Sequence, residues 1–221
     1  MSSAITKRKI LDNALLCFNR EGLSNVRLQH IAEEANMSIG NMTYHFRTKD
    51  DIVRAVWREL LQAQLTLLSE FRVLPLFEDI ERLLRSTFVL QQQYAFFYVD
   101  TLEVMRAYPD IQAEHRQHIA WQEQQMALAL AFNHARGALL DILAEEEERQ
   151  LLAARFWTLT DTWIYRCQVK GLSADHYELF ARQVWDLLFP YFTQTGKNEF
   201  RQMLFLFSEK SPIFEGKDNN E

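Results

Sequence analysis

The chain has 221 residues, of which 48% are hydrophobic, and it carries a formal net charge of −6. That hydrophobic content supports a sizeable core and excludes a protein disordered beyond its ends, while only six glycines and four prolines favour long helices with few turns. No apolar run reaches the roughly 20 residues of a membrane span, the first residues lack a signal-peptide core, and the two cysteines have no disulfide or metal spacing. We therefore expect an all-α, soluble protein of the cytoplasm, with no membrane contact.

The positive charge is concentrated near the N-terminus. Residues 1–57 contain eight Lys or Arg and six Asp or Glu, a net charge of +2, which leaves −8 for the remainder. Lys7, Arg8 and Lys9 stand together, as in a segment that contacts DNA phosphates or, equally, in a solvated tail. The acidic remainder argues against a protein that wraps nucleic acid.

Residues 27–49 have the pattern of two short helices joined by a three-residue turn, as in a helix-turn-helix. Apolar and small side chains recur at helical spacing in the first half: Leu28, Ile31 and Ala32. We expect a helix over residues 27–34 with Asn25 before it as the cap, and Ser38 as the cap of the second helix. The turn is then Ala35–Met37.

The second helix of this pair has an unusual outward side. Met42 and Phe46 are four residues apart on a core-facing stripe, whereas the outward positions are Asn41, Thr43, Tyr44 and His45 instead of Lys and Glu. Asn pairs with adenine, Thr bonds phosphate or touches a thymine methyl group, and Tyr and His reach phosphates or bases. Gly40 permits close approach of the backbone to DNA. The pattern predicts a helix in the major groove, and a helical hairpin of another small α-domain is the alternative.

Five segments at fixed spacing carry a family resemblance: ILDNALLCF at 10–18, Gly22, IAEEA at 31–35, MSIGN at 37–41 and YHFRTK at 44–49. With them, residues 5–57 resemble the DNA-binding domain of the TetR family of bacterial transcriptional regulators. The resemblance implies an N-terminal three-helix domain with a helix-turn-helix over residues 1–50. A helical effector-binding and dimerisation domain would follow over 51–210, and then a disordered tail over 211–221.

The resemblance also implies a set of DNA contacts: Arg27, Gln29, Ser38, Ile39, Asn41, Thr43, Tyr44, His45 and Lys49. Lys49 would hold phosphate at the start of the fourth helix. Two positions depart from the family pattern. Val26 and Arg27 stand where the family often has a Thr, so a guanidinium replaces the expected hydroxyl contact with phosphate. Thr43 stands where a phosphate-binding Tyr is frequent, and Tyr44 compensates for it in part.

Beyond the N-terminal domain, periodicity and helix-end residues predict further helices. The fourth, from Lys49 to Arg72, is long enough to join two domains rigidly. The others are expected from Pro75, over 94–108, from Pro109 to near Gly137, from Glu145 to near Gly171, over 174–193 and over 198–207.

The middle of the chain is rich in aromatic residues and methionine, which line ligand cavities or fill cores. We expect a pocket for a small, mainly apolar and aromatic effector, with these candidate lining residues: Phe88, Phe97, Tyr98, Met105, Trp121, Met126, Trp157 and Asp161. Asp100, Glu103 and Asp161 lie among apolar positions, where they either orient a cationic or hydroxyl-bearing ligand or face water.

The last long helices are apolar over more than one stripe, so each needs partners on two sides. In TetR-like proteins the corresponding helices pair with their twofold mates. A homodimer of this kind would place two recognition helices about 34–36 Å apart. The candidate interface residues are Phe156, Leu159, Trp163, Phe180, Val184, Leu187, Leu188 and Tyr191. The alternative is that they fill the core of a monomer.

These features together favour a DNA-binding repressor whose affinity for an operator is changed by an effector through linkage between the two sites. Members of this family usually repress, although some activate or need a corepressor. No enzyme activity, metal or cofactor is expected, because His115, His118 and His134 lack further ligands and no glycine-rich phosphate loop is present. The main alternative is a helical dimeric adaptor that does not recognise DNA sequence.

Overall fold

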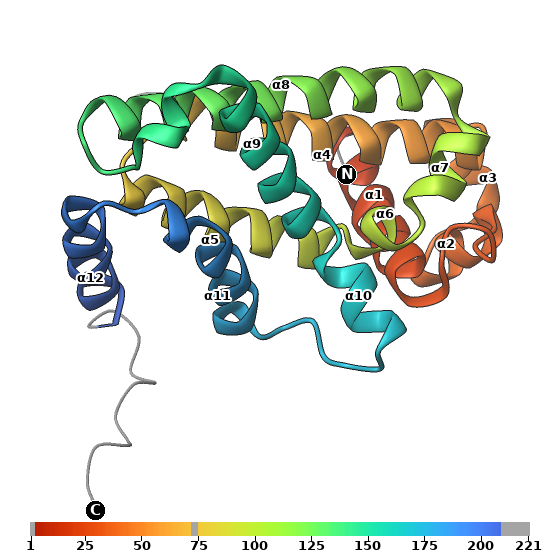
Figure 1. Cartoon of the computed structure of the whole chain (residues 1–221). Helices are drawn as coiled ribbons and strands as arrows, with labels where there is room; N and C mark the ends of the chain where they lie inside the picture. Colours follow the sequence, from red (N-terminus) through yellow and green to blue (C-terminus); the bar gives the residue numbers. More distant parts are fainter. Residues whose placement is uncertain (1–2, 72–74, 209–221) are drawn as a thin grey trace, which may run out of the picture.

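Helices make up almost all of the structure. The computed structural model describes residues 3–71 and 75–208, and Figure 1 shows short helices at one end of the molecule and longer ones beyond them. Within the described residues, the only strand-like pairing is an isolated bridge between Leu139 and Phe192. The all-α prediction is confirmed. The predicted tail, residues 211–221, lies outside the described residues.

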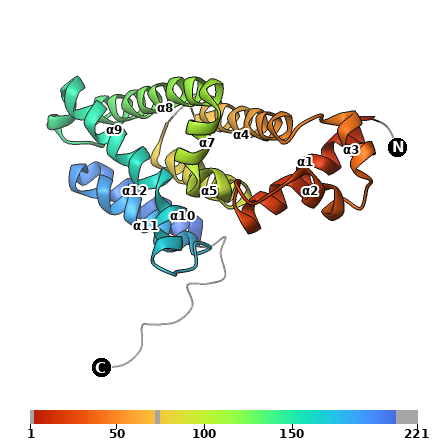
Figure 2. The same cartoon turned by 90° about the vertical axis from the view of Figure 1, so that its right-hand side faces the viewer.

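The N-terminal domain consists of α1 (Ser3–Glu21), α2 (Leu28–Glu34) and α3 (Ile39–His45). Apolar side chains from all three helices meet in its centre and are fully buried: Ile10, Ala14, Phe18, Ile31 and Met42. Burial of a large apolar side chain contributes about 1.5–3 kcal/mol, which stabilises two seven-residue helices that are too short to persist alone. Figure 2 shows this domain at one side of the molecule, apart from the C-terminal helices.

The turn between α2 and α3 lies at residues 35–37, as predicted. Asn36 adopts a φ of 50°, in the left-handed region that Asn tolerates better than most residues. The predicted cap of α2 is wrong. The Asn25 side chain donates to the Glu21 carbonyl at 2.8 Å and thus belongs to the end of α1, whereas Arg27 occupies the N-cap position of α2.

The body of the molecule follows in chain order. Its α-helices are α4 (Lys49–Phe71), α5 (Phe77–Gln93), α6 (Ala95–Val99), α7 (Thr101–Ala107), α8 (Pro109–Ala135), α9 (Glu146–Asp161), α10 (Trp163–Val169), α11 (Tyr177–Leu188) and α12 (Gln194–Ser208). Two 3-10 turns, η1 (Asp141–Ala144) and η2 (Phe189–Tyr191), were not predicted from the sequence. α4 runs without a break from the N-terminal domain into the body, alongside α8 (Figure 1).

Two helices predicted as continuous are broken. The helix predicted over 94–108 is interrupted at Asp100, between α6 and α7, where the carboxylate accepts a hydrogen bond from the Leu23 amide at 3.2 Å. The helix predicted from Glu145 is interrupted at Thr162. The hydroxyls of Thr160 and Thr162 donate to carbonyls four residues earlier, at 2.7 and 2.8 Å, and such back-bonding bends helices.

Some of the other helix ends lie at the proline and glycine residues that predicted them. Pro109 opens α8, and Gly137 and Gly171 follow the ends of α8 and α10 with φ of 78° and 65°, as predicted. Pro75 does not open α5, which begins two residues later at Phe77. α11 ends at Leu188 because the proline that follows cannot donate a helical hydrogen bond. Among the described residues, none of the helices combines the length and apolar composition needed to cross a bilayer.

Candidate DNA-contact surface and ligand cavity

Helix α3 is anchored at its N-terminus and on its inner side. Ser38, in extended conformation, accepts a hydrogen bond from the Asn41 backbone amide at 3.2 Å, which confirms the predicted cap. A cap of this kind stabilises a helix by about 1 kcal/mol, and α3 has only seven residues. Met42 is fully buried beneath it. Cap and anchor together fix the direction in which the outer side chains point.

The outer side of α3 presents side chains suited to a DNA groove. Tyr44 is 83% exposed and Ile39 is 47% exposed, and Asn41 is exposed beside them. The Tyr44 ring meets the His45 ring edge-on, with centroids 5.1 Å apart. Apolar, aromatic and amide groups gathered on one helix can contact bases, thymine methyl groups and phosphates. The outward orientation of Asn41 and Tyr44 agrees with the sequence pattern, and their contact with DNA stays a prediction.

Three of the remaining predicted contact residues, Thr43, Gln29 and Lys49, are engaged in hydrogen bonds within the protein. The Thr43 hydroxyl donates to the Gly40 carbonyl at 3.1 Å, and the Gln29 amide donates to the Glu33 carboxylate at 3.0 Å. Arg27 is exposed at the start of α2. The Lys49 ammonium donates to the Leu23 carbonyl, and burial lowers the pKa of this lysine. A phosphate would therefore have to compete with an internal hydrogen bond for Lys49.

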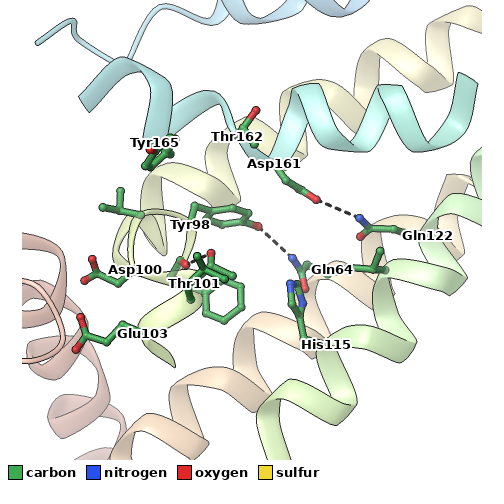
Figure 3. A pocket seen from close by; sticks show the side chains of 14 residues that line it. Gln64, Tyr98, Asp100, Thr101, Glu103, His115, Gln122, Asp161, Thr162 and Tyr165 are labelled. Carbon is green, nitrogen blue, oxygen red and sulfur yellow. Dashed lines mark hydrogen bonds between the residues drawn. The ribbon is translucent and has the colours of Figure 1, made fainter. Parts of the chain in front are cut away.

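The body contains a half-enclosed cavity of about 510 Å³. Its walls come from α4, α6, α7, α8 and the break between α9 and α10, and Figure 3 shows the side chains that converge on it. The lining residues are Gln64, Phe97, Tyr98, Val99, Asp100, Thr101, Leu102, Glu103, His115, Ile119, Gln122, Asp161, Thr162 and Tyr165. A larger but shallower hollow of about 670 Å³ lies over α1, α4 and α5. We call the more enclosed space of about 510 Å³ the main cavity. A side hollow of about 20 Å³ shares Gln64, Tyr98, Gln122 and Asp161 with it.

Only part of the predicted pocket set lines these spaces. Phe97, Tyr98 and Asp161 line the main cavity, and Trp157 lines the side hollow. The other candidates lie elsewhere: Phe88, Met105 and Met126 are buried core residues, and Trp121 is half-buried beside His118. Half of the predicted residues thus line these spaces, beside polar residues that the sequence did not single out as pocket residues, among them Gln64, His115, His118 and Gln122. Their sequence signal was weak, because a glutamine on a helix normally faces water.

The cavity walls perturb their ionisable groups. Burial raises the pKa of the Asp161 carboxyl to about 7, although the Gln122 amide donates to it at 3.2 Å. Burial also lowers the pKa of both His115 and His118 to about 4, so these rings are neutral at physiological pH. The Tyr98 hydroxyl accepts a hydrogen bond from Gln64 at 3.0 Å, and burial raises its pKa. Among the described residues, no three His, Cys, Asp or Glu side chains are grouped to hold a metal ion.

Most of the predicted dimer-interface residues lie inside the single chain. Phe156, Trp163, Phe180, Val184 and Leu188 are buried. The Phe180 ring packs against Phe88 and Trp163 at centroid distances of 5.4 and 5.8 Å. In the single chain these five side chains therefore pack mainly into the core, as in the alternative of a monomer core, and their part in a dimer interface stays a prediction. Leu159, Leu187 and Tyr191 are half-buried and keep some exposed surface.

Comparison with known proteins agrees with this architecture. A family model described as bacterial regulatory proteins of the tetR family matches residues 10–56. A second model, described as a bacterial transcriptional repressor of the TetR type, matches residues 56–200, about two thirds of the chain.

The chain belongs to the TetR family.

Relatives of this TetR-family protein match it over different extents. The Escherichia coli K12 transcriptional regulator RutR is 39% identical over 66 residues, which are 30% of this chain and 31% of RutR. AcrR of Shigella flexneri is 36% identical over 52 residues, 24% of each chain. The chain thus spans under a third of these curated relatives. A TetR-family regulator from Marinobacter aquaeolei VT8 has a crystal structure with 25% identity and a TM-score of 0.81, covering 96% of this chain and all of that one.

Gly40 offers a test of how closely the backbone of α3 approaches DNA. A Cβ at Gly40 would meet no atom of the protein within 4 Å. Gly40→Ala is therefore expected to raise the free energy of unfolding by about 0.5–1 kcal/mol, because Ala is the better helix former. The same substitution is expected to weaken DNA binding if the backbone lies against the groove. Urea unfolding and DNA titration measure the two effects, and DNA affinity equal to wild type would place the groove away from Gly40.

Asp161 offers a test of burial in the main cavity. Asp161→Asn is expected to raise the free energy of unfolding by about 1–3 kcal/mol above pH 7 and to change it little near pH 4. The pKa of this carboxyl is about 7 in the folded protein and about 4 in an unfolded chain. The wild type therefore loses stability as the pH rises from about 4 to 7 and does not regain it above 7. Urea unfolding at pH 4.5 and pH 8 measures the change in the free energy of unfolding at each pH. An equal increase at both pH values would show that burial of the charged carboxylate is not the cause.

Proposed function

We propose that this TetR-family protein is a transcriptional repressor that binds an operator through α3 and loses affinity for it when a small effector fills the main cavity. The observation that carries the proposal is the outer side of α3, where Tyr44, Ile39 and Asn41 are exposed on a helix fixed by the Ser38 cap and the buried Met42. Because its target is DNA, we place the protein in the cytoplasm.

A homodimer is the second part of the proposal. One N-terminal domain offers a single short helix to the groove, whereas a twofold pair would read two half-sites about 34–36 Å apart. Exposed apolar side chains gather on α10, on α11 and between them: Val169, Leu172 and Leu179. Their burial against a second copy would explain their exposure in one chain. Sedimentation of the 26.2 kDa chain at micromolar concentration is expected to give twice that mass.

The effector part of the proposal is supported by the size of the main cavity. Cavities of about 300–1,000 Å³ are typical of small-molecule sites, and this one has about 510 Å³. Its walls join α4, which continues into the N-terminal domain, to α6 and α7. A ligand that favours one arrangement of these helices therefore changes DNA affinity by linkage.

The proposal is tested by DNA binding. The purified protein is titrated with DNA that flanks its own gene and with scrambled DNA, at two salt concentrations. Tight binding to one native fragment, with affinity that falls as salt rises, supports a regulator. Failure to select any fragment across the source genome would favour the alternative of a helical dimeric adaptor, whose N-terminal domain contacts another protein.

A further inference from the structure

The loop between α1 and α2, residues 22–27, is held by two carboxylates from the body of the molecule. The Leu23 amide donates to the Asp100 carboxylate at 3.2 Å, and the Ser24 hydroxyl donates to the Glu103 carboxylate. Asp100 lies at the break between α6 and α7, and Glu103 lies in the first turn of α7. These two side chains are therefore among the contacts that position the N-terminal domain on the body, together with the hydrogen bonds of Asn19 to the Gln93 carbonyl and the Phe96 amide.

The same two carboxylates line the main cavity. Figure 3 shows Asp100 and Glu103 at the end of the cavity next to the N-terminal helices, and Asp161 at another side, bonded to Gln122. The lining thus includes three carboxyl groups and neither Lys nor Arg. The ammonium of Lys49 lies outside this lining, donates to the Leu23 carbonyl and interacts electrostatically with Glu103, so it offsets part of the charge of that one carboxylate. The carboxylates of a half-enclosed cavity without basic side chains attract cations and repel anions.

The other walls suit the body of an organic cation. Phe97, Tyr98 and Tyr165 line the cavity, and the faces of aromatic rings attract ammonium groups. No charged imidazole opposes such a ligand, because burial lowers the pKa of His115 to about 4. A cation of this kind would be held by charge and by aromatic contact together.

Two buried polar groups beside these spaces have atoms without a hydrogen-bond partner in the protein. His118 is only 4% exposed, lines the side hollow, and has no hydrogen-bond partner at either ring nitrogen. The Gln64 amide oxygen, which lines both spaces, is also buried without a partner. Buried polar atoms are costly when left unpaired. A ligand with a polar group, or the water that it brings, would satisfy them.

We propose that the main cavity binds a compact organic ammonium ion with an apolar body, and that this cation draws Asp100 and Glu103 away from the loop at residues 22–27. The inference rests on the proposed function and deepens it, because it names the effector class and the contacts through which binding reaches the N-terminal domain. In the free protein the two carboxylates hold the loop, and in the complex they neutralise the ligand. The ligand and the loop compete for the same oxygens.

The ligand class is tested on the full chain with probes of matched shape. Benzyltrimethylammonium, its neutral isostere neopentylbenzene and the anion phenylacetate are titrated while tryptophan fluorescence is recorded. The cation is expected to bind at least about tenfold more tightly than the isostere, a ratio typical of a desolvated charge and aromatic contact. Equal or tighter binding of the isostere or phenylacetate, or no binding of the cation, overturns the proposal.

A charge-removing variant locates the bound cation. At pH 8, where the Asp161 carboxyl with its pKa of about 7 is ionised, Asp161→Asn is expected to weaken binding of the cation about tenfold and to leave the affinity for the isostere unchanged. The matched control is Asp186→Asn on α11, an exposed carboxylate paired with Arg182 outside the cavity. It is expected to bind the cation as the wild type does. An equal loss of cation affinity in both variants would show that the cation binds outside the cavity.

The double variant Asp100→Asn/Glu103→Gln tests the coupling. It keeps oxygen acceptors for the Leu23 amide and the Ser24 hydroxyl but removes the charges that attract the cation. Saturating cation is expected to lower operator affinity at least about tenfold in the wild type and less than about twofold in this variant. A wild-type response in the variant overturns the coupling. If the wild type binds its operator with the same affinity with and without the cation, this inference fails and the proposed binding to DNA stands. If the protein binds the cation but no DNA, the proposed function fails and the assignment of the ligand class stands.

Discussion

Replacement of both Asn41 and Tyr44 by Ala is expected to lower operator affinity about 100-fold or more, since each base-edge or phosphate contact contributes about 1–3 kcal/mol. The loss should be confined to DNA binding. Tyr44 is 83% exposed, and the cap of α3 uses the backbone amide of Asn41, which Ala retains. The free energy of unfolding is therefore expected to stay within about 0.5 kcal/mol of the wild type.

Fluorescence anisotropy with the native operator and with scrambled DNA measures this effect. The matched control is Gln112→Ala, an exposed polar position on α8, which is expected to bind the operator normally. Both variants should give the same denaturation curve as the wild type. If the double variant keeps wild-type affinity, the protein reads its operator with another element, and α3 is not the recognition helix.

Local signals in the sequence predicted the N-terminal domain well. The cap at Ser38 and the turn around Asn36 depend on neighbours three or four residues away, so residue type alone indicates them. The predicted helix cap at Asn25 is wrong, although it was derived from the same rule. Its amide reaches back to the carbonyl of Glu21 at the end of α1, and the sequence contains no signal that decides between the two partners.

The body of the molecule was harder to predict because its important contacts are distant in sequence. The helix break at Asp100 coincides with a hydrogen bond to Leu23, which is 77 residues earlier. The polar walls of the main cavity, such as Gln64 and Gln122, come from helices whose individual patterns do not identify a cavity. Aromatic content pointed to the region in which the structure has its cavity. It did not distinguish Phe97 in the cavity from Phe88 in the core.

The largest change in stability is expected from a substitution at Gly196, where α12 packs against the turn after α8. A Cβ at Gly196 would lie 2.1 Å from the carbonyl oxygen of Ala138 and 3.1 Å from its carbonyl carbon. The Ala138 carbonyl also accepts the Thr193 amide at 3.1 Å, and the Thr193 hydroxyl donates to the Gly137 carbonyl at 2.7 Å. These contacts hold the start of α12 against the turn after α8, so neither backbone can move aside without breaking hydrogen bonds.

Gly196→Ala is therefore expected to lower the free energy of unfolding by about 3 kcal/mol or more, at the upper end of the cost of overpacking. The melting temperature is expected to fall by about 6–12 °C for a chain of this length. Thermal and urea unfolding measure the loss, with Gly40→Ala as the matched control, because the same methyl group enters open space there. Equal stability of the Gly196→Ala variant and the wild type would mean that α12 does not dock on the Ala138 turn. A loss at Gly196 alone would show that this backbone contact requires glycine.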